Sequence, residues 1–383
     1  IFFLFIKIIL LVIIILMRVI LFFSYGVSLK DWKSSGLFER EVKFYKYIQS
    51  KKNVSVTFVT YGDESDFKYQ EEISNIEIIP IYELYKKHKN NIQRIIYSLV
   101  IGFKLRRKLS YRKSNVKTNQ LWGSWVAIMF SLFTNNNLII RTGYDLLTFK
   151  KQEKKSKIKI FLYWLVTQMS LLFGNHYIVT SKTDKESLKR RRLLQTSKIK
   201  VIPNWIDLKN DNQLKKNGFI SVGRFEKQKN FDKLIESFSN LSEEVTLIGD
   251  GSLKKDLYKL SKNLNSKINF EGILSNDEVI KKLSKHKFYI HTALYEGNPK
   301  TILEAMSVGC VVIVPNNPNI LEIVQDNFNG IIYDQKKDNL KNTIQNIKNK
   351  DVEQISQNAI ATVKKNNSLE KIVDLEFSLY IND

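Results

Sequence analysis

The apolar residues of this chain fall into two alternating patterns. Short β-branched and aromatic runs are typical of buried strands, and between them lie stretches in which apolar positions recur at helical spacing. Strands that alternate with helices predict parallel sheets with right-handed crossovers. The predicted strands cover residues 18–23, 54–60, 76–79, 138–142, 176–180, 200–203, 219–223, 245–248, 268–272, 288–293, 311–314 and 330–333. The predicted helices cover residues 37–49, 89–109, 157–173, 183–194, 302–308 and 368–381, and a further helix begins at Phe231.

The length of the chain allows two domains, because 383 residues are enough for two cores of ordinary size. Both halves have the same strand–helix rhythm, and a polar stretch separates them. We therefore predict an α/β protein with one domain at residues 17–205, a linker at 206–217 and a second domain at 218–366. Each domain should hold a doubly wound, Rossmann-like sheet, and the two domains should face a central cleft.

The first 23 residues are apolar except for Lys7 and Arg18. Such a run is long enough to span a bilayer, so a membrane anchor is one interpretation. The other is that Met17 is the functional start, because a first strand follows it directly and the chain has no earlier methionine. We favour Met17 and treat residues 1–16 as an apolar extension, either upstream translation or an anchor.

The composition narrows the class of protein. An apolar content of 43% and a charged content of 26% are those of a folded globular chain. The only cysteine, Cys310, excludes an internal disulfide and begins an apolar strand, so we expect it to be buried and inert. No metal site is predicted, because the histidines are scattered without ligand spacing. They are His88, His176, His286 and His291.

Positive charge is concentrated in the first half. Residues 1–205 hold 36 Lys and Arg against 14 Asp and Glu, a net charge of +22, whereas the remainder is close to neutral at +1. This half should face something anionic: a membrane surface, a phospholipid-linked acceptor or a nucleic acid. The helix at 89–109 ends in basic residues and either lies on an anionic bilayer or packs on the core. The helix at 157–173 is apolar almost all round and is either buried or interfacial.

Two carboxylates stand on either side of a turn in the second half. Glu296 follows the strand at 288–293, and Glu304 lies about one turn into the next helix. Free backbone N–H groups at a helix start bind phosphate oxygens, and carboxylates suit the hydroxyls of a sugar. The sequence therefore predicts a site for a nucleotide-linked sugar.

This stretch resembles the signature of the retaining family 4 glycosyltransferases, Glu-Gly-x-Pro-x-x-x-Leu-Glu-Ala-Met, and every named position is present from Glu296 to Met306. The resemblance implies the GT-B fold, with a last helix (residues 367–383) that crosses back to the first domain. It also implies that Glu304 binds the ribose and Glu296 the sugar hydroxyls. Arg224 and Lys229 resemble the basic pair that holds the donor diphosphate in this family. The remaining expected substrate contacts are Gly36, Gly223, Gly297, Asn298, Pro299, Lys300 and Thr301.

The first half matches the family less well. Ser35-Gly36 is only half of the family's glycine pair, and Trp205 replaces the glycine expected in the interdomain phrase at 203–207. Many members have a histidine near residues 141–145, where this chain has none, so no catalytic base is assigned. Arg141 and Asp145 follow a strand and are candidates for acceptor contact.

The resemblance implies a metal-independent retaining hexosyltransferase without a cofactor, acting in cell-envelope glycan synthesis. A nucleoside-diphosphate sugar would be the donor, and a saccharide or lipid-linked molecule the acceptor. We expect a cytoplasmic protein, peripheral at the inner face of the membrane, that binds no nucleic acid. The alternatives are a phosphorylase-type or hydrolytic enzyme on a related fold, and a noncatalytic protein that docks on anionic membranes or nucleic acid through its basic half. The donor sugar, the base and the acceptor are not determined by the sequence.

Overall fold

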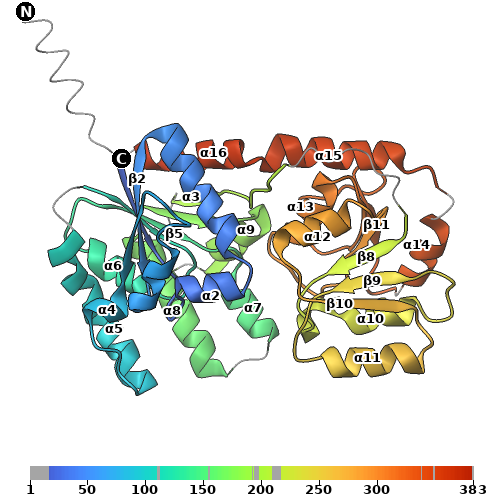
Figure 1. Cartoon of the computed structure of the whole chain (residues 1–383), viewed down its shortest axis with the longest axis horizontal. Coiled ribbons are helices and arrows are strands. Elements are labelled where there is room, and N and C mark those ends of the chain that lie inside the picture. The colour runs from blue at the N-terminus through green and yellow to red at the C-terminus, as the bar shows by residue number, and fades with distance from the viewer. Residues whose placement is uncertain are drawn as a thin grey trace, which may run out of the picture.

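The computed structural model describes residues 17–109, 113–153, 156–191, 193, 198–208, 217–337, 339–347 and 350–381. They form two parallel sheets of seven and six strands, each with helices on both faces (Figure 1). The predicted α/β class and GT-B architecture are confirmed. The expected N-terminal extension, residues 1–16, and most of the expected linker, residues 209–216, lie outside the described residues.

The first sheet has the strand order β3-β2-β1-β4-β5-β6-β7, and its neighbouring strands are all parallel. The order reverses at β1, and such a switch point is where doubly wound folds bind ligands. Its strands are β1 (Met17–Phe22), β2 (Val54–Thr60), β3 (Ile76–Pro80), β4 (Asn115–Thr118), β5 (Asn137–Arg141), β6 (His176–Val179) and β7 (Ile199–Val201). Its helices are α2 (Leu29–Ser34), α3 (Phe38–Lys52), α4 (Ile81–Leu84), α5 (Asn91–Leu109), α6 (Ser124–Ser131), α7 (Leu146–Gln152), α8 (Lys157–Phe173) and α9 (Lys182–Arg191), with a 3-10 helix at Glu64–Tyr69.

The second sheet repeats this order as β10-β9-β8-β11-β12-β13. Its strands are β8 (Phe219–Val222), β9 (Val245–Ile248), β10 (Ile268–Gly272), β11 (Phe288–Ile290), β12 (Val311–Pro315) and β13 (Ile331–Tyr333). Its helices are α10 (Phe231–Ser237), α11 (Lys254–Asn263), α12 (Asn276–Leu283), α13 (Lys300–Ser307), α14 (Leu340–Ile347) and α15 (Glu353–Asn367), with a 3-10 turn at Lys227–Lys229.

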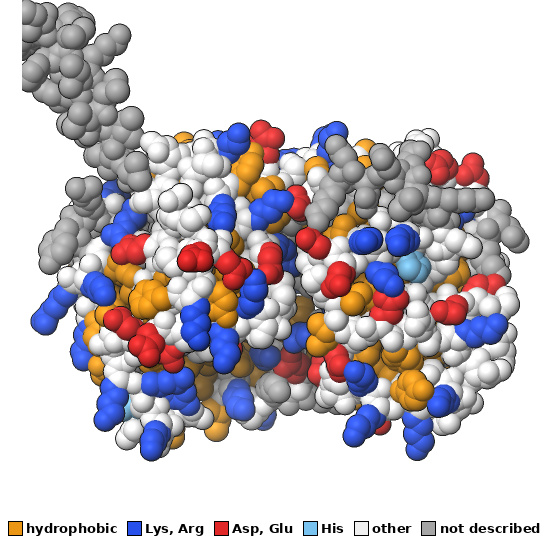
Figure 2. All heavy atoms as spheres, in the orientation of Figure 1, with side chains coloured by type: hydrophobic (Ala, Val, Ile, Leu, Met, Phe, Trp, Pro, Cys, Tyr) orange, Lys and Arg blue, Asp and Glu red, His pale blue; other side chains and the backbone are white. Residues whose placement is uncertain are grey.

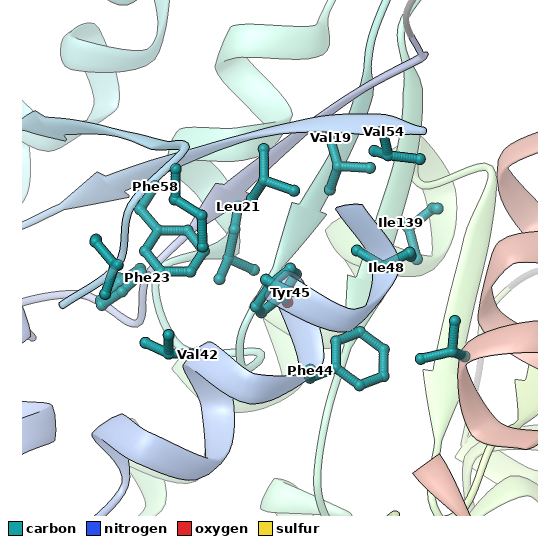
Figure 3. Packing of buried hydrophobic residues seen from close by; sticks show 14 of the residues in the cluster. Val19, Leu21, Phe23, Val42, Phe44, Tyr45, Ile48, Val54, Phe58 and Ile139 are labelled. Carbon is teal, nitrogen blue, oxygen red and sulfur yellow. The ribbon is translucent and has the colours of Figure 1, made fainter. Parts of the chain in front are cut away.

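Each sheet is buried on both faces. On one face of the first sheet, α3 packs Phe44, Tyr45 and Ile48 against strand residues such as Phe58 (Figure 3). The other face is covered by α5, α6 and α8, of which α6 is almost wholly buried. Burial on both faces explains why the strands read as nearly continuous apolar runs.

The last helix, α16 (Leu369–Ile381), leaves the second domain and lies along the first (Figure 1). Ile372, Val373, Leu379 and Tyr380 are buried in the same cluster as α3. Its one buried carboxylate, Glu376, forms ion pairs with Lys117 on β4 and Arg141 on β5. The end of the chain therefore ties the two domains together.

Some elements differ from the prediction. Residues 24–36, which separate the predicted strand at 18–23 from the predicted helix at 37–49, contain α2. This helix begins with a capping box between Ser28 and Asp31 and buries Leu29 and Trp32. Strand β4 and the helices α6 and α7 were not predicted either. Strand β4 has the sequence Asn-Val-Lys-Thr and is buried throughout, so the polar appearance of its residues hid a central strand.

Candidate active site

A cleft of about 660 Å³ opens between the two sheets and is lined by residues of both domains. That volume is within the range of sites that hold a drug-sized ligand. In Figure 2 the molecule is hollowed between its two halves, where acidic and basic side chains meet. The predicted residues that line this cleft are Gly223, Arg224, Lys229, Glu296, Gly297, Asn298, Pro299, Lys300 and Thr301.

Glu296 lies in the loop between β11 and α13. Its side chain is 9% exposed and forms an ion pair with Lys229, which follows β8 in the neighbouring crossover. Burial by itself would raise the pKa of Glu296, but the Lys229 ammonium and the His291 ring lower it to about 2. Glu296 is therefore ionised at neutral pH and can accept hydrogen bonds only.

His291 was not predicted as a site residue. It is buried at the end of β11, and its Nε2 is 3.3 Å from Glu296 Oε1. Its Nδ1 is 3.2 Å from the hydroxyl of Tyr289, which lies 2.9 Å from Thr301 Oγ1. Burial lowers the pKa of His291, so the ring is neutral at pH 7. These contacts join Thr301 in the cleft wall to Glu296.

Glu304 lies one turn into α13, behind the cleft wall. Its side chain is buried and accepts a hydrogen bond of 3.0 Å from Asn276 Nδ2 at the start of α12. Burial raises the pKa of Glu304, and the charge of Arg40 in the first domain opposes that shift. The two glutamates therefore have different environments: Glu296 has a cation beside it, whereas Glu304 is held by an amide.

Lys300 at the start of α13 reaches across to the first domain. Its Nζ is 3.2 Å from Glu41 Oε1 on α3, and Arg40 lies 3.4 Å from the same oxygen. Burial and the nearby Arg40 lower the pKa of Lys300 to about 8. Lys300 thus carries a charge that a bound ligand can influence.

Arg224 follows β8 directly after Gly223. It is exposed and, within the described part of the chain, forms no ion pair. A Cβ on Gly223 would lie 3.2 Å from Phe231 and 3.5 Å from the Lys229 side chain, so this turn has little spare room. The turn presents Arg224 beside Lys229, two cations that can share one diphosphate.

The loop that carries Glu296 touches the first domain. A Cβ on Gly297 would lie only 2.8 Å from Tyr144 Cβ and 2.9 Å from Gly143 O, so a side chain here would force the domains apart. Asn204 donates its backbone N–H to Asn298 Oδ1 at 3.0 Å and its Nδ2 to Asn298 O at 2.7 Å. These contacts fix the loop across the domain boundary.

Several residues of the cleft lie in a part of the chain that resembles a known family. Residues 206–365 match the family described as glycosyl transferases group 1. This match covers less than half of the chain and includes Arg224, Lys229, Glu296 and Glu304.

Two curated relatives of this chain have names that contain diphospho-undecaprenol or diphosphoundecaprenol. One is the N-acetylgalactosamine-N,N'-diacetylbacillosaminyl-diphospho-undecaprenol 4-alpha-N-acetylgalactosaminyltransferase of Campylobacter jejuni, 26% identical over 232 residues, which cover 56% of this chain and 61% of the relative. The other is the UDP-Gal:alpha-D-GlcNAc-diphosphoundecaprenol alpha-1,3-galactosyltransferase of Escherichia coli, 29% identical over 204 residues, which cover 47% and 52%. The chain thus spans about half to three-fifths of the length of these relatives.

Solved structures share the whole two-domain fold. The Anabaena HepE complex with UDP and glucose matches with a TM-score of 0.72 at 15% identity, covering 94% of this chain and 98% of that one. TarM of S. aureus matches with a TM-score of 0.74 at 14% identity, covering 96% and 99%. At such identities the likeness establishes the fold alone.

Not every predicted residue of the first half has a role at the cleft. Gly36 precedes α3 with a φ of +69°, and its neighbour Leu37 lines the cleft instead. Arg141 lines the cleft but is paired with Glu376. Asp145 caps α7 and pairs with Arg191 at 2.9 Å, so its role is structural. Trp205 is buried and lies outside the left-handed φ region, so the missing glycine is not needed.

The described residues contain no cluster of three or more His, Cys, Asp or Glu side chains that could hold a metal ion. None of their helices combines the length and the apolar character that a bilayer-spanning helix needs.

Proposed function

We propose that this protein is a retaining glycosyltransferase that moves a hexose from a nucleoside-diphosphate donor to a saccharide or lipid-linked acceptor in cell-envelope glycan synthesis. The observation that carries the proposal is the arrangement of Arg224, Lys229 and Glu296. They come from two adjacent crossovers of the second sheet and meet in the cleft shared with the first domain. The match to group 1 glycosyl transferases in the same residues supports it.

The donor diphosphate would be held by Arg224 and Lys229, together with backbone N–H groups at the start of α13. These cations stabilise the negative charge that develops on the leaving group, which is why we propose a metal-independent reaction without a cofactor. Glu296 would accept hydrogen bonds from the sugar hydroxyls. Glu304 would bind the ribose once the donor displaces its contact with Asn276.

The acceptor and the location are proposed from the relatives and from charge. The names of the C. jejuni and E. coli relatives contain diphospho-undecaprenol and diphosphoundecaprenol, which favours a lipid-linked acceptor here too. The positive first half agrees with a peripheral position at the inner face of the membrane. A noncatalytic docking protein is disfavoured, because it has no use for a carboxylate and a lysine buried together in a cleft.

The proposal is tested by the thermal unfolding of the protein with UDP, GDP and ADP added separately. A nucleotide present at about a hundred times its dissociation constant should stabilise the native state by roughly 2.7 kcal/mol. Glu304→Ala should lose this response and the transfer of labelled sugar, whereas the control Glu236→Ala, on the exposed side of α10, should keep both. If no nucleotide stabilises the wild type, or if Glu304→Ala responds and transfers as the wild type does, the assigned donor site is wrong.

A further inference from the structure

Two helices of the first domain leave large apolar side chains in water. On α5 these are Ile92, Ile95, Ile96, Leu99, Val100 and Phe103, and on α8 they are Ile158, Phe161, Leu162, Leu165, Leu172 and Phe173. Ile92 is 68% exposed and Ile158 is 74% exposed. Isolated exposed apolar residues are normal, but contiguous stripes of them on a helix indicate an interaction surface.

Each stripe lies opposite the side that packs on the domain. On α5 the inward positions include Ile101 and Leu105, and on α8 they include Thr167 and Leu171. Helices of a soluble domain normally keep only one apolar face. Both α5 and α8 have an apolar inner face and an apolar outer face. The outer face of each helix does not pack against the rest of the domain.

The two helices belong to one layer. The buried helix α6 contacts both, because Trp125 Nε1 donates to Ser98 Oγ on α5 at 2.8 Å and Ser124 Oγ is 2.9 Å from Ser170 Oγ on α8. Figure 1 shows both helices running to the same lower edge of the first domain. Along that edge in Figure 2, apolar and basic side chains are mixed, with a group of acidic side chains toward its left end. The outer faces can therefore meet one flat partner together.

The charges around this layer identify the partner. Neither α5 nor α8 contains an acidic residue. Lys104 and Lys108 on α5 and Lys157 and Lys159 on α8 are exposed beside the stripes. Lysine stems cover apolar surface while their ammonium groups reach lipid headgroups, and the headgroups of anionic lipids attract them. A basic and apolar helix face without acids is typical of helices that lie in a bilayer interface.

We propose that the outer faces of α5 and α8 together form a docking surface for an anionic lipid bilayer. Helix α7 packs against α8, and its Phe149 and Lys150 line the cleft. Docking would thus bring the first-domain side of the cleft close to the lipid surface. The purpose of docking rests on the proposed transfer to a lipid-linked acceptor, whereas the docking surface itself does not.

The experiment is sedimentation of the full chain with vesicles of phosphatidylcholine alone and with vesicles that also contain phosphatidylglycerol. The wild type should bind the anionic vesicles and release them at high salt. The double variant Phe161→Glu with Leu165→Glu should bind about tenfold or more weakly, because two acids replace two inserted apolar groups. The matched control is Tyr258→Glu with Ile360→Glu, at similarly exposed positions of the second domain, and it should bind as the wild type does.

Several outcomes would overturn the docking surface. Equal binding of the wild type and the α8 variant would assign the vesicle contact to another part of the chain. Binding that does not depend on anionic lipid would remove the role of the lysines. Self-association that the α8 variant abolishes, without vesicle binding, would show that a second copy covers the surface. Stabilisation by a nucleotide does not depend on any of these results, so failure here is distinguishable from failure of the proposed transfer.

Discussion

The two domains have the same strand order but use their charged residues differently. In the second domain, which is nearly neutral, the cations at the cleft are few. Lys229 is paired with Glu296, Lys300 is paired with Glu41 of the first domain, and Arg224 is exposed. In the first domain, which holds most of the net charge, basic residues are spread over surface helices such as α5. The proposals above thus give the domains different tasks: one would position a small ligand, and the other would meet an extended anionic surface.

The buried charges show the same division. Glu296 is buried beside Lys229 at a point that a ligand can reach. Lys117 and Glu376 are buried more completely, with 3% and 1% of their side chains exposed, and they connect β4 to α16. A buried ion pair costs desolvation energy in both places. We infer that the pair of Lys229 and Glu296 serves ligand binding, and that the pair of Lys117 and Glu376 holds α16 against the first domain.

The largest effect is expected from breaking the pair in the second domain. Lys229→Met keeps the length of the side chain but leaves Glu296 buried without its cation, so the pKa of Glu296 should rise. The diphosphate would also lose one of its two cations. We expect the rate of transfer to fall by about 10²- to 10³-fold, as for loss of one charge-stabilising donor, measured with saturating donor.

The control for this change is Lys227→Met, an exposed lysine in the same turn. It should keep the wild-type rate, because it does not line the cleft. A Lys229→Met enzyme that transfers within about twofold of the wild type would contradict the role of Lys229 in charge stabilisation. The division between the two domains would then lose its main support.

The sequence predicted well which second-domain residues line the cleft, because their positions depend on local order. Glu296, Gly297 and Pro299 follow one strand and start one helix, so a short phrase places them together. His291 was not predicted as a site residue although it directly follows the same strand, because the spacing of the histidines indicates no metal site. Its position five residues before Glu296, at the carboxyl end of β11, is the signal that would have found it.

The first domain was harder to predict because its buried polar groups depend on distant partners. Lys117 in β4 is buried only because Glu376, near the end of the chain, lies against it. Asn115 accepts a hydrogen bond from Asn137 of β5 at 2.8 Å. No local pattern marks such a strand as buried, since its polar side chains are satisfied by residues far away in sequence.

A smaller effect, on stability, is expected from the pair in the first domain. Glu376→Gln leaves Lys117 and Arg141 facing a neutral amide, and a buried charge without its partner costs about 3 kcal/mol. All five tryptophans lie within residues 17–205, so their fluorescence during urea unfolding reports the first domain. Glu370→Gln, at an exposed position of α16, should leave the unfolding curve unchanged. Unfolding of Glu376→Gln at the wild-type urea concentration would show that α16 is not held by this ion pair.

The smallest effect, again on stability, is expected at a contact between the two domains that contains the buried carboxyl group of Asp184. Asp184 on α9 is 4% exposed and accepts a hydrogen bond of 3.1 Å from Asn319 Nδ2, which also donates to Glu296 O at 2.8 Å. Burial raises the pKa of Asp184 to about 6. Between about pH 4 and pH 6 the folded protein therefore keeps a proton that the unfolded chain has lost, so stability falls as the pH rises through this range.

Asp184→Asn removes the carboxyl group that binds this proton, because an asparagine side chain does not titrate. Relative to the wild type, the variant should gain about 2 kcal/mol of unfolding free energy between pH 4 and pH 7, again followed by tryptophan fluorescence. The new amide can also change the free energy of unfolding by an amount that is the same at every pH. This change does not affect the test, because only the pH dependence of the two proteins is compared. Asp256→Asn, at an exposed position of α11, should follow the wild type at every pH. If Asp184→Asn has the same pH dependence as the wild type, the carboxylate is ionised in the native state, and the contact between the domains tolerates a charge that Asn319 alone compensates.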